Sequence, residues 1–364
     1  MSWFAIADRA GAMFDPHGLG VQRQSAPVLD ASDDSLLVRG SLVIETRLSP
    51  GQRPQPLLLF EQEGRWALKI SLQAIPGGGI IMILSQGEDI QHCAVNQSDA
   101  GRTDVLRITY TWDSLARRGF VAVERTERDQ LVMVPLKDPK PLRVRDLKAL
   151  FSENGKLYLD EDLIYLAAST EIEPVGPMPT MSVDTPIATP DGYRRIGELK
   201  RGDTVFSNEG LVVPVLHQIS RTVPARGSFV PVRVRAPYFG LQRDVLVAPS
   251  QRLVITGSEV EYLFGQEAVL VPVCHLSGGS SAIPVSGHAT ITYSQLLLPG
   301  HEALVASGAE VESLNIGRLR RKPKRLAASM FSDFDRSSLP DHGQSLYPVL
   351  RAFDSIVLAE HRAA

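Results

Sequence analysis

The chain has 364 residues, of which 43% are hydrophobic, and this length is typical of two domains of ordinary size. A net charge of -3 and a pI near 6.3 exclude a general electrostatic attraction to nucleic acid or to anionic membranes. The two cysteines, Cys93 and Cys274, lie far apart in the sequence, so the predicted fold does not depend on a disulfide.

The N-terminal sequence MSWFAIADRAGAMFDPHG does not have the pattern of a signal peptide. Asp8 and Arg9 interrupt the apolar start before a hydrophobic region of normal length can form. No stretch approaches the ~20 apolar residues that are needed to cross a bilayer. We therefore expect a cytoplasmic protein, with export by a route that uses no cleaved N-terminal signal as the alternative.

Short strands between turn signals are predicted from Leu36 to about Pro135. In segments such as SLLVRGSLVIETRLS, RWALKISLQ and DVLRITYTWD, apolar and polar residues alternate with a period of two. Gly77, Gly78 and Gly79 supply a turn between two of these strands. The pattern predicts an antiparallel β-sandwich with one buried face per sheet, and the residues expected to face solvent are Arg107, Thr109 and Glu124.

Two tryptophans of this region are predicted to lie in the core of the sandwich. Trp66 shares the period-two pattern with Leu68, Ile70 and Leu72, and Trp112 ends the segment TYTW. A tryptophan that lay exposed on a sheet face would instead be a candidate for stacking against a sugar.

The strand series, with TYTWD and LVMVPL, resembles the laminin G/concanavalin-like jelly-roll class, and we predict that this domain spans residues 1–172. Many members of the class bind glycans, so the resemblance implies a glycan, or a surface or assembly component, as the partner. A helix is predicted over residues 146–155, with Asp146 as its N-cap and Asn154-Gly155 as its stop signal. The proline-rich segment 173–179 is predicted to be an extended linker.

The region after the linker contains several blocks in a characteristic order. They include TPIATPDGYRRIGELKRGDTVFSNEG, QRDVLVAPSQRLVI, ITYSQLLLPGHEALVASGAEVESLNIG and YPVLRAFDSIVL. This series resembles the Hedgehog/intein (Hint) domain in the form found in alphaproteobacteria, and the resemblance covers residues 180–364. It implies a compact, all-β, horseshoe-like fold, here with a short C-terminal helix.

The resemblance also implies an acyl shift as the chemistry. In this family a side-chain nucleophile, normally cysteine, attacks the preceding peptide carbonyl, and a histidine protonates the departing nitrogen. The position of the cysteine is occupied by Thr180, and Ser182 is the only other nearby hydroxyl. The histidine position is occupied by Gln251 in APSQR, and glutamine cannot deliver a proton at pH 7.

Two histidines are candidates for a substitute acid. His275 follows the apolar run AVLVPV, and His301 follows Pro299-Gly300 at a predicted turn. For both, a structural role is favoured over a catalytic one, and rescue of the chemistry by either of them is the alternative.

The remaining motifs add no cofactor. No HExxH motif or pair of CxxC motifs occurs, so neither a metal nor another cofactor is predicted. The basic run RLRRKPKR (Arg318 to Arg325) is interpreted as a solvated connector in which Pro323 prevents a helix, and not as a nucleic-acid site. The segment YPVLRAFDSIVL is predicted to form an amphipathic docking helix.

Two functions follow from this pattern. In the first, the Hint domain has lost its processing chemistry, and the protein is a binding or structural module. In the second, the domain still cleaves itself by an N–O acyl shift at Thr180 or Ser182. The proline before Thr180 is an awkward acyl donor, which favours Ser182 within the second function.

Overall fold

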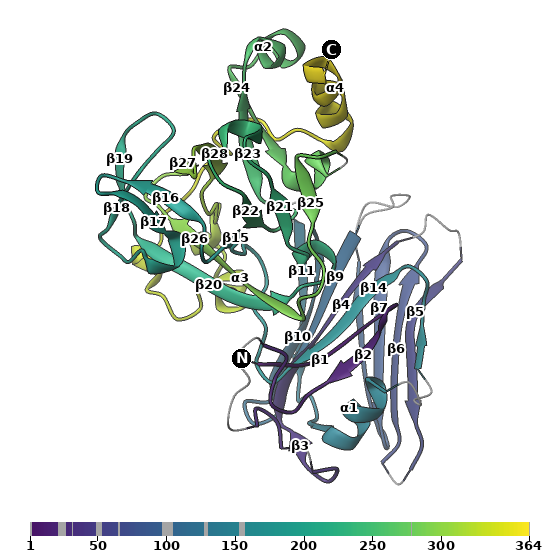
Figure 1. The fold of residues 1–364 in the computed structure, drawn as a ribbon. Coiled ribbons are helices and arrows are strands. Elements are labelled where there is room, and N and C mark those ends of the chain that lie inside the picture. The colour runs from purple at the N-terminus through teal and green to yellow at the C-terminus, as the bar shows by residue number, and fades with distance from the viewer. Residues whose placement is uncertain are drawn as a thin grey trace. The chain divides into compact units, whose positions relative to one another are not determined.

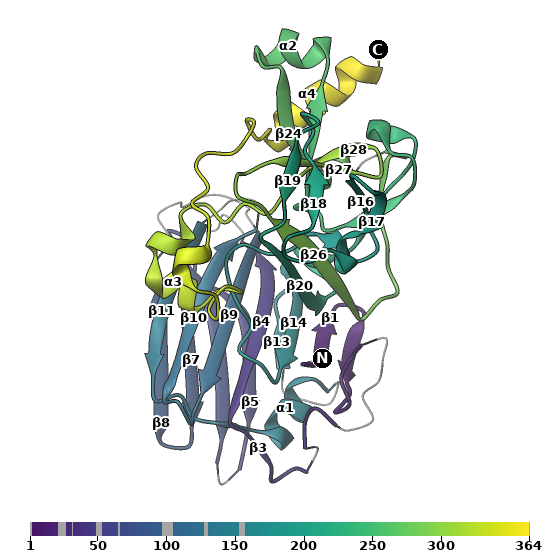
Figure 2. The ribbon, with the colours of Figure 1, turned by 90° about the vertical axis from the view of Figure 1, so that its left-hand side faces the viewer.

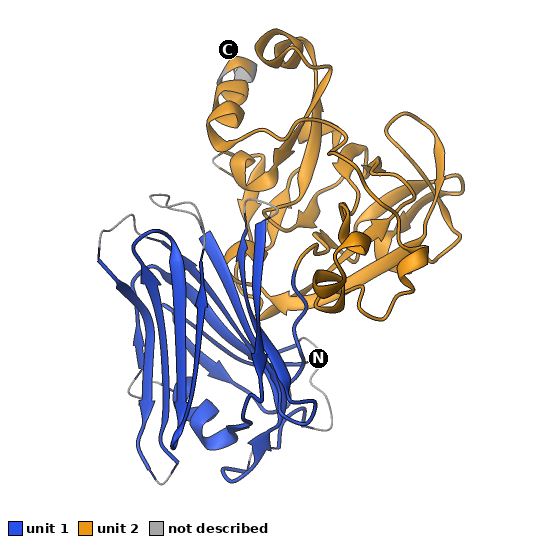
Figure 3. Ribbon diagram, turned by 180° about the vertical axis from the view of Figure 1, so that it is seen from behind, with its two compact units in different colours: residues 1–175 blue, residues 176–364 orange. Residues whose placement is uncertain are grey.

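The computed structural model describes residues 2–20, 27–30, 32–48, 53–64, 66–96, 105–126, 130–152, 157–277 and 279–363. The chain divides into two compact units, residues 1–175 and residues 176–364 (Figure 3). Both units are built mainly from antiparallel strands with few short helices, so the predicted fold class is confirmed.

The first unit is a β-sandwich (Figure 1). Its seven-stranded sheet has the order β11-β10-β9-β4-β14-β1-β2, its five-stranded sheet has the order β13-β5-β6-β7-β8, and a small third sheet pairs β12 with β3. The bounds are β1 Trp3–Asp8, β2 Gly11–Phe14, β3 Leu36–Leu37, β4 Arg39–Arg47, β5 Gln55–Gln62, β6 Leu68–Ile75, β7 Gly79–Gln86, β8 Asp89–Val95, β9 Val105–Asp113, β10 Arg118–Arg125, β11 Gln130–Lys137, β12 Leu142–Arg143, α1 Val144–Leu150, β13 Leu157–Leu159 and β14 Leu163–Ser169.

One hydrophobic core fills the space between the two large sheets. Alternate residues of β4 and β9, such as Leu42 and Ile108, join alternate residues of β6 and β7, such as Ile70 and Met82, in one buried cluster. The period-two pattern therefore identified the inward face correctly, because successive side chains of a strand point to opposite faces. Trp112 is fully buried in this cluster, as predicted.

Two predictions for the sandwich are wrong. Arg107, Thr109 and Glu124 are buried, although they lie on the face of their sheet opposite the core. Arg107 stands directly opposite Glu45 on β4 and Glu124 on β10, so its positive charge lies between two carboxylates on the neighbouring strands. Trp66 is 57% exposed, because it precedes β6 in a turn, where the period of the strand no longer applies.

The helix predicted over residues 146–155 is shorter and begins earlier. Helix α1 runs from Val144 to Leu150 after Arg143, which makes no side-chain capping bond. Asp146 is not the N-cap but lies in the first turn, where Arg143 Nε donates to its carboxylate over 2.9 Å. Asn154 and Gly155, the predicted stop signal, lie outside the described residues.

The second unit contains two six-stranded sheets and a two-stranded sheet (Figure 2). The sheet orders are β20-β26-β15-β22-β21-β25, β17-β16-β27-β28-β23-β24 and β18-β19. The strand bounds are β15 Met181–Ser182, β16 Pro186–Thr189, β17 Gly192–Arg195, β18 Thr204–Phe206, β19 Val212–Pro214, β20 His217–Pro224, β21 Val232–Val234, β22 Val245–Val247, β23 Arg252–Thr256, β24 Ala268–Pro272, β25 Ala282–Pro284, β26 Thr290–Leu297, β27 Ala303–Ala306 and β28 Ala309–Glu312. The helices are α2 Ser258–Phe264, α3 Pro323–Ala327 and α4 Ala352–Ala363, and the 3-10 turns include η4 Val273–Leu276 and η5 Leu319–Arg321.

The basic run is a folded segment and not a solvated connector. Leu319 of η5 and Leu326 of α3 are buried in a small apolar cluster with Phe331 and Leu339. Pro323 does not prevent the helix, because it occupies the first turn of α3, where its missing N–H would have no helical partner. The predicted C-terminal helix corresponds to α4, of which Leu358 joins the main core of the unit. None of the helices in the described ranges is long and apolar enough to cross a membrane.

Candidate functional site

Thr180 is held at the start of β15, the central short strand of one sheet. The N–H of Ala248 donates to its carbonyl over 2.7 Å, and Met181 pairs with Val247 on one side and Ser294 on the other. These bonds fix the backbone of residue 180 between β22 and β26. The side chain of Thr180 thereby contacts one residue of β26, Gln295, and one residue that follows β22 in the chain, Gln251.

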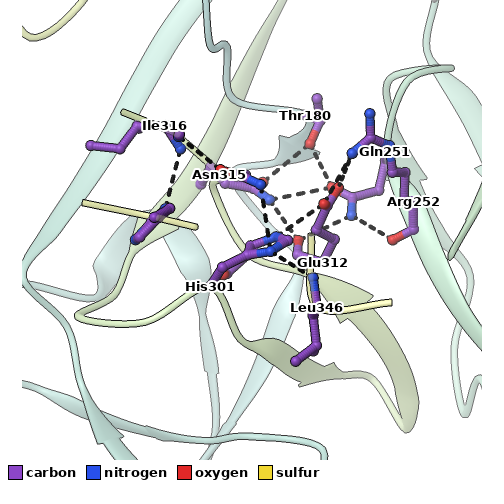
Figure 4. A network of polar contacts seen from close by, with 12 residues as sticks. Thr180, Gln251, Arg252, His301, Glu312, Asn315, Ile316 and Leu346 are labelled. Carbon is purple, nitrogen blue, oxygen red and sulfur yellow. Dashed lines mark hydrogen bonds and ion pairs between the residues drawn. The ribbon is translucent and has the colours of Figure 1, made fainter. Parts of the chain in front are cut away.

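The hydroxyl of Thr180 forms hydrogen bonds with two buried glutamines, Gln251 (Figure 4) and Gln295. Its Oγ1 lies 2.5 Å from Oε1 of Gln251 and 3.2 Å from Oε1 of Gln295. Both glutamines are almost completely buried, with 2% and 3% exposure. The structure thus places the two positions that the sequence suggested, 180 and 251, in direct contact.

The amide groups of the glutamines are oriented by one backbone carbonyl. Nε2 of Gln295 donates to the carbonyl of Glu312 over 2.8 Å, and Nε2 of Gln251 donates to the same oxygen over 3.2 Å and to Arg252 O over 2.9 Å. Because the nitrogens are engaged there, both amide oxygens face Thr180 and accept from its hydroxyl. A neutral amide is neither a useful base nor an acid at pH 7, so this contact does not activate the hydroxyl.

Gln295 is the residue of this site that the sequence reasoning missed. It lies on β26 in the run SQLLL, and its neighbour Ser294 pairs with Met181. The available signal was a single amide side chain directly before the apolar run Leu296 to Leu298, since buried polar groups require a partner. That signal does not reveal the partner, which is 115 residues away in the chain.

Ser182 does not belong to this cluster. It is half-buried at the end of β15, and its carbonyl accepts from the N–H of Thr185 over 3.0 Å. Its hydroxyl makes no hydrogen bond within the described part of the chain. Of the two hydroxyls considered, the structure brings only that of Thr180 to Gln251.

His301 belongs to the next layer of the polar network (Figure 4). Its Nδ1 accepts from the N–H of Leu346 over 3.1 Å, which assigns the proton of the ring to Nε2, and Nε2 lies 3.0 Å from Oε1 of Glu312. Glu312 also accepts from Nη1 of Arg252 over 3.1 Å. His301 is therefore linked to the glutamines through Glu312 and not by a direct bond to Thr180.

The side chain of His275 contacts the C-terminal helix, although the N–H of Val273 in the same turn donates to the carbonyl of Gln251 over 2.9 Å. It is part of η4, and its Nδ1 lies 3.4 Å from Oγ of Ser355 on α4. Ser355 is buried, so this contact helps to seat α4 on the unit. No hydrogen bond connects His275 with Thr180 or Gln251 in the described ranges.

A third histidine, His342, was not singled out in the sequence and is 2% exposed. Its Nδ1 accepts from the N–H of Ile316 over 3.2 Å, which leaves Nε2 to donate to the carbonyl of Leu298 over 3.1 Å. Burial lowers the pKa of His342 below its ordinary value of 6.5 despite the bond to Leu298, and His301 acts in the same direction as burial. The folded state therefore favours the neutral ring.

We expect the stability of the second unit to fall as the pH is lowered through and below about 6.5, because only the unfolded state then gains the proton of His342. His342→Gln can keep both hydrogen bonds and removes the titration, so its stability should depend less on pH. The measurement is urea unfolding at about pH 7 and pH 5, followed by far-UV circular dichroism. The transition of the second unit is the one that circular dichroism shows and tryptophan fluorescence does not. All three tryptophans (Trp3, Trp66 and Trp112) lie in the first unit. An equal pH dependence in both proteins would contradict this assignment.

Comparisons with known proteins give one family match and several similar solved structures. The Hint domain family model matches residues 179–318. Among solved structures, the chain is similar to the Mch DnaB-1 intein, with 13% identity, a TM-score of 0.27, and coverage of 36% of this chain and 98% of that one. It is also similar to the gp41-1 intein, with 12% identity, a TM-score of 0.26, and coverage of 37% and 98%. The Ruminococcus gnavus IT-sialidase CBM40 has 13% identity, a TM-score of 0.29, and coverage of 47% and 88%. No curated protein matches the sequence.

Proposed function

We propose that the Hint domain carried by the second unit no longer cleaves the chain efficiently, and that the protein acts intact as a binding or structural module. The observation that supports this is the environment of Thr180, whose hydroxyl lies 2.5 Å from one neutral amide oxygen and 3.2 Å from another. A hydroxyl is almost entirely un-ionised at pH 7, and neither amide removes its proton.

The acyl shift requires a general acid, and this is the group that the site lacks in our proposal. In an acyl shift at Thr180, Oγ1 would bond to the carbonyl carbon of Pro179, the C–N bond to Thr180 would break, and the hydroxyl proton would pass to the leaving nitrogen. Water would then hydrolyse the ester. The step needs an acid beside the leaving nitrogen, and losing a general acid costs about 10²–10⁴-fold in rate. Gln251 and Gln295, the two side chains that contact the hydroxyl, carry no proton that they can give up at pH 7.

In this proposal residues 1–172 form a laminin G-like sandwich and residues 180–364 form a Hint domain of the bacterial type, with residues 173–179 as the linker. The sandwich binds a glycan or a component of a surface or assembly, and the second unit serves as its scaffold. The protein is proposed to be cytoplasmic, with export that uses no cleaved N-terminal signal as the alternative.

The proposal is tested by the intact mass of the purified full-length protein. We expect a single mass near 39.8 kDa after incubation at neutral pH, with or without hydroxylamine or a thiol. These nucleophiles intercept an ester or thioester at the junction even where water resolves it slowly. Two fragments that meet at Thr180 or Ser182 would show that a hydroxyl has kept the chemistry.

The alternative function, self-cleavage by an N–O acyl shift, is favoured by one observation. Thr180 lies at the head of β15 inside a polar network, and this alternative assigns the nucleophile to that position. Within this alternative the geometry favours Thr180, because Ser182 lies outside the network. Thr180→Ala should then abolish fragment formation and Ser182→Ala should leave it unchanged.

A further inference from the structure

Trp66 is the tryptophan that the first unit presents to solvent. Trp3 and Trp112 are 1% and 0% exposed, whereas Trp66 is 57% exposed. An exposed indole keeps a large apolar surface in water, and such side chains are typical of binding surfaces. This indole requires an explanation, because the strand that follows it buries Leu68 and Ile70 in the core.

The backbone that carries Trp66 is held firmly. The guanidinium of Arg143 donates to the carbonyl of Trp66, and Arg143 is itself anchored by two bonds to the fully buried Asp146, over 2.9 and 3.3 Å. On the other side, the N–H of Gly87 donates to the carbonyl of Ala67 over 2.9 Å. The exposed indole therefore does not result from a loosely held turn.

Gly87 lies next to the indole ring of Trp66. It has φ of 62°, in the left-handed region that favours glycine, and a methyl group on it would lie 3.4 Å from Cε3 of the indole. The six-membered part of the ring thus lies beside Gly87, at a distance that would place such a methyl group in ordinary van der Waals contact with it. An indole has only two rotatable side-chain bonds, so it loses little conformational freedom when a ligand packs on it.

Charged side chains lie close in sequence or in space to the turns that contain Trp66 and Gly87. Arg145 is 46% exposed, and its Nε is 3.9 Å from Asp146, whose carboxylate is already engaged by Arg143, so its donors remain available. A methyl group on Gly64, two residues before Trp66, would lie 3.3 Å from Nη2 of Arg145, so the guanidinium lies near this turn. Asp89, two residues after Gly87, forms an exposed ion pair with Lys140 at 3.5 Å.

We propose that Trp66 and Arg145 form a glycan-binding site at this end of the sandwich. The indole would stack against the apolar C–H face of a sugar ring, while Arg145 and Asp89 would hydrogen-bond to its hydroxyls. A flat apolar surface accompanied by charged donors and acceptors is complementary to a sugar, which has one apolar face and a polar edge. The inference rests on the proposed binding role of the sandwich and gives that role a location.

The experiment starts with a glycan array probed with the full chain, followed by titration of a retained oligosaccharide while tryptophan fluorescence is recorded. Because Trp66 is exposed and the other two tryptophans are buried, we expect the ligand to shift the emission and to protect it from acrylamide quenching. Trp66→Ala should weaken binding by at least about tenfold, and Arg145→Ala should weaken it as well. Tyr262→Ala, which removes an 83% exposed ring from the second unit, is the control and should bind normally.

Failure to retain any glycan, or equal binding by Trp66→Ala and the wild type, would overturn the inference. Circular dichroism of each variant distinguishes lost binding from lost folding. The intact mass of the same sample keeps the two proposals separate. Fragments would count against the loss of processing, whereas an intact chain whose glycan binding is unchanged by Trp66→Ala would count against the Trp66 site alone.

Discussion

A chain that carries both Thr180→Cys and Gln251→His is expected to cut itself between Pro179 and residue 180. Oγ1 of Thr180 and Oε1 of Gln251 are only 2.5 Å apart, so a thiol and an imidazole at these positions would lie within hydrogen-bonding reach. A thiol is far more ionised at pH 7 than a hydroxyl, and an imidazole titrates close to neutral pH. The histidine should raise the cleavage rate by about 10²–10⁴-fold over Thr180→Cys alone.

Cleavage is measured by intact mass over several days with hydroxylamine present. The control is Thr180→Ala with Gln251→His, which contains the acid but no nucleophile and should remain whole. Gln251 also donates to the carbonyl of Glu312, so the folding of the double variant needs to be checked by circular dichroism. A folded double variant that stays intact would mean that the residues at 180 and 251 do not account for the proposed loss of processing.

Arg107→Ala is expected to lower the free energy of unfolding of the first unit by about 3–5 kcal/mol. This loss should be larger than that caused by a single substitution at an exposed position of the same unit. Burial opposes the charge of Arg107, but Glu124 and Glu45 outweigh it and raise its pKa above the ordinary value. The side chains of Glu45 and Glu124 are only 1% and 10% exposed. In Arg107→Ala, both carboxylates would stay buried but would lose the positive charge that lies between them.

Urea unfolding followed by tryptophan fluorescence measures this effect, because all three tryptophans belong to the first unit. The matched control is Lys69→Ala, which breaks an ion pair of similar length, 3.7 Å to Glu61, between side chains that are 57% and 55% exposed. Exposed pairs contribute about 0–1 kcal/mol, so the control should unfold almost like the wild type. Equal losses in the two variants would refute a special role for the buried charges.

Local patterns in the sequence predicted the strands of the sandwich well. Alternation fixes which face of a strand is apolar, and Leu68, Ile70 and Leu72 are buried as that alternation requires. It fails at Trp66, because the pattern does not show where the strand begins. It also cannot show that Glu45, Arg107 and Glu124 are direct neighbours, since this depends on the register of three strands.

The sequence predicted only those residues of the site whose positions could be matched to the family that it resembles. Thr180 and Gln251 were identified in this way, whereas Gln295, Glu312 and His342 were not. Their roles arise from contacts between distant strands, such as the bond from Gln295 to the carbonyl of Glu312. A polar residue in an apolar run indicates that a partner exists, but only the tertiary structure identifies the partner.

The pairing of β1 with β14 has a consequence for synthesis on the ribosome. Trp3 lies opposite Ser169, so β1 can pair early with β2 but must wait for its other neighbour until almost the whole unit has been translated. At about 5–20 residues per second, this delay lasts on the order of 10–30 s. During that time the β1 edge of a nascent β1–β2 hairpin would stay unpaired, and an unpaired strand edge can pair with another chain.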